Sequence, residues 1–496
     1  MFYENTNQKI KPQTVLISFG VIILIQPLLD IASYFAGLSN LTAITTGLRF
    51  VLLALITCYG FYLAQNKRPY WITIGVLALF YMFHFLANYL TGYISIKSDI
   101  AMYARVAQLP LFYISFIDIF KAMQQDYTRE DLIKYTEIFI FLNLITITLS
   151  IGLSFLVGMP EFTYNNGLAG PHGIKGWFTN GNSQSVILCI IVSISMGLVL
   201  RSKKYWVSTL ILIIGYASLF YYGTKLAFFA IYLISIASVI LILFSKKTSK
   251  LLLIIIVLAT GSVYALKSYS PMYVNAHYTG QSFNEWDEEI KKIEKENEKN
   301  NHTKPGENTK VDREYFLANQ EMYLKVYNLY NKPLVDEFGL EKVAAKYNYS
   351  LDAYQLIDNR NVKLVAASLV YDESSTLQHL FGFEQEAYTV SGEVYDLEND
   401  LHGIFYSYGF VGFAIYAAFL IYIVIRGIAN YFFAEDFRFD TNLGVLLLAF
   451  ALIIGAAQFS GNVLKRPNVL FYISLIMSAI QFSSYPIRQV FKKNDI

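Results

Sequence analysis

The amino-acid sequence predicts an all-α, polytopic membrane protein with about twelve transmembrane helices and one large, mostly helical extracytoplasmic loop. Three observations predict this fold class. Of the 496 residues, 55% are hydrophobic and only 15% are charged, whereas a soluble protein is usually about a quarter charged. Apolar stretches of about 20 residues recur from Val15 to Ile487. A polar block of about 130 residues interrupts these stretches between Lys267 and Leu401.

The composition also excludes several classes of protein. A soluble enzyme with one membrane anchor, a disordered chain and an outer-membrane β-barrel each need a different pattern of apolar residues. The net charge of +2 gives no indication of nucleic-acid binding. Cys58 and Cys189 both lie in apolar segments, so we expect neither a disulfide framework nor a zinc site.

Each expected span is long enough to cross about 30 Å of hydrocarbon as a helix. We place the spans near residues 14–37, 41–64, 70–91, 100–121, 135–158, 183–200, 205–222, 224–244, 251–268, 401–425, 441–460 and 468–486. Only a tight turn at Tyr222-Gly223 separates the seventh span from the eighth. The expected domains are therefore residues 1–268 with nine spans, residues 269–400 as the loop, and residues 401–496 with three spans.

The positions of lysine and arginine in the short connections predict the orientation, because cytoplasmic connections carry the excess of these residues. One set of connections is rich in both, and the opposite set holds only Lys97, Lys175, Lys465 and Arg466 apart from the polar block. We therefore expect a multi-pass protein of the plasma membrane with both termini in the cytoplasm and the block at 269–400 outside.

Three helical patterns are expected in the outside block. The segment 285–299 is a charged, exposed helix, and residues 314–331 and 335–347 follow as two more. The segment 361–371 is amphipathic, and we expect it to lie on the membrane or to pack over the spans.

Charged residues inside the spans collect on the outer side. Asp30, Arg49, Arg105 and Lys225 all fall in the outer part of their spans by this orientation. Cations at headgroup depth match the phosphates that are available there. Arg49, Arg105 and Lys225, with Lys465 from the same side, are therefore candidate phosphate ligands. The alternative is that these side chains extend to the interface as ordinary snorkelling residues.

Two polar segments add further candidates. Glu398, Asp400 and His402 lie where the block re-enters the membrane, and two carboxylates with an imidazole make a plausible acid–base set. The alternative for Asp400 is helix capping. Asn180 and Asn182 belong to a Gly- and Asn-rich stretch whose amides and backbone suit sugar hydroxyls or phosphate. The histidines show no spacing typical of metal ligands.

Four stretches resemble the O-antigen ligase/polymerase family in the version found in Gram-positive polysaccharide clusters. They are Phe178-Thr179-Asn180-Gly181-Asn182, Tyr222-Gly223-Thr224-Lys225, Asp358-Asn359-Arg360 through Leu380-Phe381-Gly382, and Glu398-Asn399-Asp400-Leu401-His402 with Tyr408-Gly409-Phe410-Val411-Gly412. Lys225 stands where the family usually has arginine, so the match at that position is not complete.

The resemblance implies a GT-C-like, inverting, metal-independent glycosyltransferase that needs no cofactor. Its donor would be a glycan on polyprenyl diphosphate, and an acceptor hydroxyl would attack the anomeric carbon. Arg360, Lys225 and Arg105 would stabilise the leaving diphosphate, and Glu398, Asp400 or His402 would act as the base. A flippase and a chain-length regulator of the same pathway, together with membrane lipids, are the expected partners.

The sequence therefore predicts a polymerase of lipid-linked repeat units that builds a surface polysaccharide such as a capsule or cell-wall polymer. A ligase that transfers the glycan to another acceptor needs the same donor site and stays open as an alternative. A flippase would need a polar path to the inner leaflet, and a receptor or scaffold would use the outside block to bind a partner.

Overall fold

The computed structural model describes residues 10–166, 170–245, 248–301, 309–459, 461 and 463–492. The described chain is mainly helical and contains two short antiparallel hairpins. It divides into two compact units. The first unit comprises Met1–Leu77, Ala104–Asn275 and Ala417–Ile496, and the second comprises Ala78–Tyr103 and Ala276–Tyr416.

Among the described residues, 11 helices are long and apolar enough to cross a membrane, which confirms the predicted all-α, polytopic fold class. They are α1 (Pro12–Leu38), α2 (Thr42–Leu63), α3 (Arg68–Tyr89), α4 (Ile96–Met123), α5 (Arg129–Leu156), α6 (Gly181–Arg201), α7 (Tyr205–Tyr222), α8 (Lys225–Phe244), α18 (Asp400–Phe433), α19 (Thr441–Phe459) and the segment Pro467–Val490, which begins with α20 (Pro467–Phe482). The expected span at 251–268 forms a shorter apolar helix of 15 residues, α9 (Leu251–Ala265). A short helix, α21 (Ile487–Lys492), follows α20.

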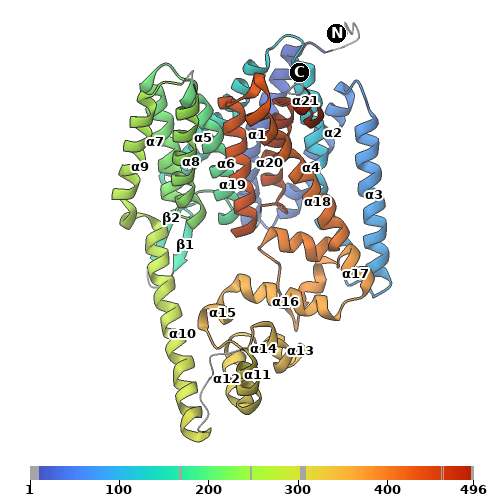
Figure 1. Ribbon diagram of the computed structural model, residues 1–496, viewed down its shortest axis with the longest axis vertical. Helices are drawn as coiled ribbons and strands as arrows, with labels where there is room; N and C mark the ends of the chain where they lie inside the picture. The colour runs from blue at the N-terminus through green and yellow to red at the C-terminus, as the bar shows by residue number, and fades with distance from the viewer. Residues whose placement is uncertain are drawn as a thin grey trace. The chain divides into compact units, whose positions relative to one another are not determined.

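The core of the first unit lies around α6, α19 and α20. α6 packs against α5, α7, α8, α19 and α20, and Figure 1 shows α6, α19 and α20 among the surrounding helices. In the most apolar stretch of α6, 94% of the residues are buried, whereas the share in α2 is 17%. α6 is therefore an internal helix, and α2 presents its apolar side chains outward, as a helix that faces lipid does.

Local sequence signals explain where several helices begin and end. Thr128 and Asp131 form a reciprocal capping box at the start of α5. Gly223 ends α7 with a φ of 79°, and Thr224 then caps α8 by accepting a hydrogen bond from the Ala227 amide. The tight turn expected at Tyr222-Gly223 is therefore present.

Residues 160–182 contain an element that sequence reasoning missed. β1 (Phe162–Asn166) pairs antiparallel with β2 (Gly170–Ile174), with Phe162 opposite Ile174. The Thr163 hydroxyl donates a hydrogen bond of 2.6 Å to the Tyr222 carbonyl at the end of α7. The hairpin thus fixes the chain that leads into α6.

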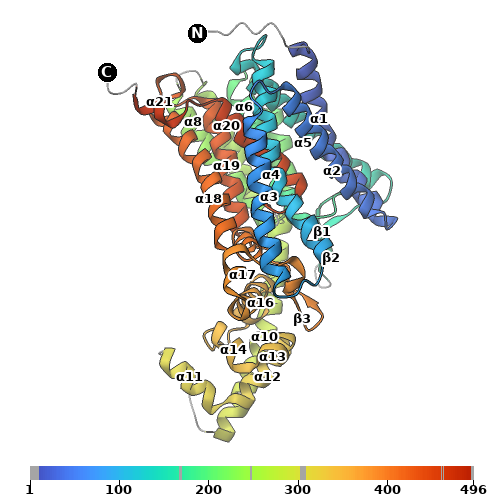
Figure 2. The same ribbon diagram turned by 90° about the vertical axis from the view of Figure 1, so that its right-hand side faces the viewer.

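The second unit contains the polar block. Its elements are α10 (Pro271–Asn301, which begins in the first unit), α11 (Thr309–Ala318), α12 (Gln320–Tyr330), α13 (Lys332–Phe338), α14 (Leu340–Lys346), α15 (Ala353–Ile357), α16 (Asn359–Glu373), α17 (Thr376–Phe381) and the hairpin of β3 (Thr389–Val390) and β4 (Glu393–Val394). A short 3₁₀ turn at Gln385–Tyr388 also belongs to this unit, whereas those at Lys267–Tyr269 and Glu435–Phe437 belong to the first unit. Figure 2 shows α12, α13 and α14 grouped together.

The amphipathic segment 361–371 packs within the loop itself. Its helix, α16, buries Val365, Ala366 and Leu369 in a cluster with Tyr327 and Val343 from α12 and α14. The apolar face is therefore occupied by the core of the second unit, which supplies the partner that the sequence pattern required.

A buried contact between His84 and Asp99 joins α3 and α4 within the second unit. His84 Nε2 lies 3.1 Å from Asp99 Oδ2, and His84 Nδ1 lies 2.7 Å from the Phe381 carbonyl oxygen. Both ring nitrogens face acceptors, so the ring uses both as donors only when it carries two protons. Asn88 donates a hydrogen bond to the Gly382 carbonyl and accepts one from the Glu384 amide. The segment after α17 is thus tied to α3.

Candidate functional site

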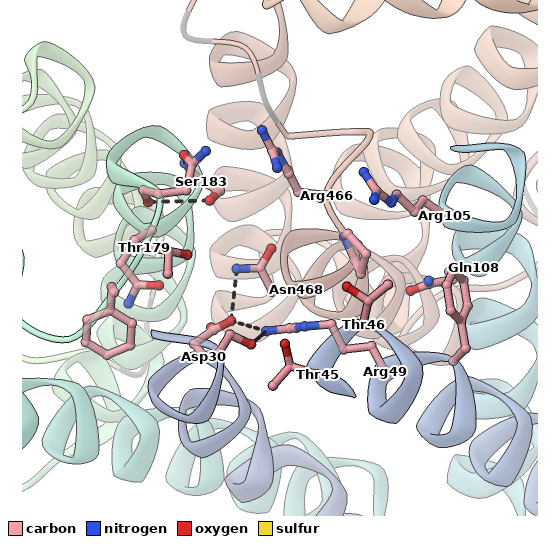
Figure 3. A pocket seen from close by; sticks show the side chains of 16 residues that line it. Asp30, Thr45, Thr46, Arg49, Arg105, Gln108, Thr179, Ser183, Arg466 and Asn468 are labelled. Atoms are coloured by element: carbon pink, nitrogen blue, oxygen red, sulfur yellow. Dashed lines mark hydrogen bonds and ion pairs between the residues drawn. The ribbon is translucent and has the colours of Figure 1, made fainter. Parts of the chain in front are cut away.

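A pocket of about 300 Å³ opens in the first unit. Polar side chains of α1, α2, α4 and α6 and of the segment that begins α20 surround it (Figure 3). The pocket is lined by Asp30, Ser33, Thr45, Thr46, Arg49, Phe50, Arg105, Gln108, Phe178, Thr179, Asn180, Ser183, Gln184, Arg466, Pro467 and Asn468.

Three arginines and one aspartate carry the formal charge of the pocket. Arg49 comes from α2, Arg105 from α4, and Arg466 immediately precedes α20. The lining therefore carries two more positive charges than negative ones. Guanidinium groups match phosphate oxygens with paired N–H donors, so the lining favours an anion with more than one phosphate oxygen.

Asp30 fixes the position of Arg49. Arg49 Nη2 lies 2.5 Å from Asp30 Oδ1 and 3.4 Å from the Ser33 hydroxyl oxygen. The Asn468 amide donates a hydrogen bond of 3.2 Å to the same carboxylate oxygen (Figure 3). Because Asp30 binds Arg49 and is itself bound by Asn468, the Arg49 guanidinium is oriented before any ligand binds.

The beginning of α6 adds to the positive character of the pocket. Asn180 caps this helix, and its side-chain oxygen accepts a hydrogen bond of 3.1 Å from the Ser183 amide. Ser183 and Gln184 in the first turn line the pocket. A helix N-terminus carries partial positive charge and suits an anionic group.

The structure brings together three of the residues predicted to bind the diphosphate. Arg49, Arg105 and Asn180 all line the pocket. Lys225, Lys465 and Asn182, although described, do not belong to its lining. Lys225 is exposed at the first turn of α8, and Lys465 is 4% exposed.

Sequence reasoning missed several polar residues of the lining, among them an arginine and three side-chain amides. Arg466 and Asn468 lie at the start of the last span, and Gln108 and Gln184 lie within expected spans. A signal for the two glutamines was present, because uncharged amides inside apolar segments are costly unless they pair or bind. Arg466 was used only as evidence of orientation.

In the second unit, Glu398 is held by two cations. Arg360 Nε lies 3.3 Å from Glu398 Oε2, and Lys363 Nζ lies 2.9 Å from Oε1. Burial raises the pKa of Glu398, but the hydrogen bonds and charges of Lys363 and Arg360 outweigh burial and hold that pKa below its ordinary range. A carboxylate with a lowered pKa is a weaker proton acceptor, so this arrangement suits Glu398 to orienting Arg360.

Asp400 and His402 lie in the first turn of α18. Glu398 precedes this helix, so Glu398 and His402 do not share one turn of α18. Asp400 is fully buried, and the His402 Nδ1 atom is buried without a hydrogen-bond partner among the described residues. Within the described part of the chain, no group of three or more His, Cys, Asp or Glu residues could hold a metal ion.

The comparison with protein families finds a match along nearly the whole chain. The model for the family described as O-antigen ligase like membrane protein matches residues 13–482. The comparison with curated proteins found no match.

Proposed function

The chain belongs to the O-antigen ligase like membrane protein family, and from this premise we propose that it polymerises polyprenyl-diphosphate-linked repeat units into a surface polysaccharide. Membership implies a membrane enzyme of the glycosyltransferase type whose substrate is a lipid-linked glycan. The proposal adds the donor, the inverting and metal-independent chemistry, and the outer face of the plasma membrane. It places both termini in the cytoplasm and the loop at 269–400 outside.

The observation that carries the proposal is the charge of the pocket in the first unit. Arg49, Arg105 and Arg466 outnumber Asp30, and the N-terminus of α6 adds partial positive charge. A diphosphate that links a lipid to a sugar carries two negative charges, which the lining can compensate. Oriented cations stabilise a leaving group most where its negative charge increases during the reaction.

In the proposed reaction, an acceptor hydroxyl oxygen forms a bond to the anomeric carbon of the donor glycan. The bond from that carbon to the diphosphate oxygen breaks, and the electron pair leaves with the polyprenyl diphosphate. The hydroxyl proton passes to a protein base. Arg49, Arg105 and Arg466 stabilise the departing diphosphate, with Asp30 and Asn468 keeping Arg49 in position.

The base is proposed among the acidic and imidazole groups at the start of α18. Asp400 and His402 are the preferred candidates, because Lys363 and Arg360 lower the basicity of Glu398. By resemblance to the family, Arg360 is proposed to take part in catalysis, with Glu398 as its orienting partner.

A ligase that transfers the finished glycan to another acceptor remains the alternative, because it would use the same donor pocket. The family description itself names a ligase, which favours this alternative. The nature of the acceptor separates the two activities: a polymerase extends a second lipid-linked glycan, and a ligase uses a different acceptor.

Glycan profiling in cells tests the proposal. The variant Arg105→Gln/Arg466→Gln removes two positive charges from the pocket and keeps polar side chains. We expect loss of long chains and accumulation of single lipid-linked repeats on the outer face of the membrane. Arg438→Gln is the matched control, because Arg438 is exposed in the same unit and does not line the pocket.

Other outcomes would contradict the polymerase. Single repeats trapped on the cytoplasmic side would indicate a flippase, and unchanged chain length would indicate a receptor or scaffold. Complete long chains on lipid that never reach their final acceptor would indicate the ligase.

A further inference from the structure

Two glutamine side chains in the pocket wall are buried, and the amide nitrogen of each lacks a hydrogen-bond partner within the described chain. Gln108 is 1% exposed and Gln184 is 2% exposed. The side-chain Nε2 atom of each has no hydrogen-bond partner among the described residues. Gln26 in the same unit is equally buried at 2% exposure, but its Nε2 donates a hydrogen bond of 3.1 Å to the Ile22 carbonyl. The two pocket glutamines thus differ from a buried glutamine that lies elsewhere.

An unbonded buried amide is energetically unfavourable. Leaving such a group without a partner costs about 1–3 kcal/mol, and most buried polar groups in proteins have a partner. A leucine or methionine would fill the same space at α4 or α6 without this cost. Two such amides on the wall of one pocket therefore indicate groups that find their partners in a ligand.

The chemistry of the amides differs from that of the arginines. Phosphate oxygens are charged, and the guanidinium groups of the lining are their natural donors. A glutamine amide is neutral and offers both N–H donors and a carbonyl acceptor, which matches the hydroxyl and acyl oxygens of a sugar. Gln108 lies one helical turn from Arg105 on α4, and Gln184 lies in the first turn of α6 beside Ser183.

We propose that Gln108 and Gln184 bind the sugar residue attached to the diphosphate of the donor and make the pocket selective for a glycosylated over a bare polyprenyl diphosphate. This inference rests on the proposed function, because it assumes that the pocket holds the donor diphosphate. It assigns the diphosphate to the arginines of the lining and the first sugar to the two amides.

Binding measurements on the purified full chain test this assignment. The probes are the lipid-linked repeat unit extracted from cells that carry the protein, and polyprenyl diphosphate alone. We expect the unmodified protein to bind the lipid-linked repeat unit more tightly than polyprenyl diphosphate alone. Gln108→Leu and Gln184→Leu should each lose about 5-fold in affinity for the repeat unit, the value of one neutral hydrogen bond, and keep their affinity for polyprenyl diphosphate.

Thermal stability separates a binding role from a structural one. Because the amides are unbonded, replacement by leucine should leave the melting temperature of the unliganded protein unchanged or raise it. Gln26→Leu is the matched control: it loses a hydrogen bond, so it should lower the melting temperature and leave the preference for the repeat unit intact.

Several results would overturn the assignment. Variants that retain the full preference for the repeat unit would show that the amides do not contact the sugar. An equal loss of affinity for both probes would place the amides on the diphosphate instead. Equal affinity of the unmodified protein for both probes would show that the pocket does not bind the sugar. No binding of either probe would show that the proposed function itself is wrong.

Discussion

At the residue scale, the surroundings of Glu398 determine what its carboxylate can do. Lys363 and Arg360 occupy both of its oxygens, and its side chain is 21% exposed. The sequence analysis includes Glu398 among the candidate bases, but the sequence contains no sign that the two cations of α16 reach this carboxylate. Such contacts depend on tertiary packing.

The lowered pKa of Glu398 makes its contribution to stability depend on pH. A carboxylate whose folded pKa lies below its unfolded value of about 4.3 stabilises the protein fully above that value, and the contribution disappears as the pH falls through the folded pKa. We expect Glu398→Gln to lower the free energy of unfolding by about 1–2 kcal/mol at neutral pH.

Thermal unfolding of the full chain at neutral and acid pH checks this expectation. The deficit of Glu398→Gln should vanish at a pH below the folded pKa, where the unmodified carboxylate is also uncharged. Glu393→Gln serves as the control because Glu393 is exposed. A deficit that persists unchanged in acid would contradict the ion-pair explanation.

The structure brings some of the predicted phosphate ligands together and leaves others apart. The sequence predicts Arg49 and Arg105 as cations in the outer part of their spans, and both line the pocket. Lys225 was chosen by the same argument and is exposed. The direction in which a side chain at a helix end points depends on its neighbours, and the apolar pattern alone does not provide that direction.

At the scale of elements, α18 is broken rather than continuous. Gly409 has a φ of 63° and a ψ of −173° inside this helix, a conformation open to glycine. An added Cβ at Gly409 would overlap the Leu380 carbonyl group, and one at Gly382 would overlap the Ser407 carbonyl group. The backbone at the end of α17 therefore lies in direct contact with the backbone of α18 at this break. Gly382 and Gly409 make this close approach possible.

Substitution of the glycine at the break should be strongly destabilising. We expect Gly409→Ala to lose more than about 2 kcal/mol of stability, from backbone strain and from displacement of the segment at the end of α17. The effect is measured as the melting temperature of the full chain in detergent, with size-exclusion chromatography used to monitor the folded fraction after heating.

Gly261→Ala on α9 is the matched control, since a Cβ there meets no atom within 4 Å. This change should be neutral or stabilising by up to about 1 kcal/mol, because alanine favours a helix. Equal melting temperatures for the two variants would show that this close approach does not require glycine.

Element boundaries were predicted well where apolar runs were long and poorly where they were absent. The helices of the spans begin and end close to the expected positions. The β1–β2 hairpin was missed, because its strands are only five residues long, β2 contains two glycines, and strand pairing is a contact between two segments. For α16, the pattern indicated an apolar face, but only the structure identifies the loop core as its partner.

At the scale of the whole molecule, hydropathy alone determined the fold class. The segments long enough to span a bilayer need no tertiary information to be recognised, since every backbone polar group in lipid must be paired within a helix. The division into units follows a different logic. The second unit includes Ala78–Tyr103 from the ends of α3 and α4, which the sequence had placed with the spans.

The pocket could be predicted only in part. Its lining comes from helices near both ends of the chain, so Arg466 and Asn468 join Asp30 and Arg49 through folding alone. The charge type of the site was visible in the sequence, whereas its full composition was not.

The most direct test of the central claim is the affinity of the purified chain for polyprenyl diphosphate and polyprenyl monophosphate. We expect the unmodified protein and Arg438→Gln to bind polyprenyl diphosphate more tightly than polyprenyl monophosphate. Arg105→Gln/Arg466→Gln should lose this preference and at least about 150-fold in diphosphate affinity, because charge-assisted hydrogen bonds contribute about 1.5–3 kcal/mol each. Undiminished diphosphate binding by the double variant would contradict the account.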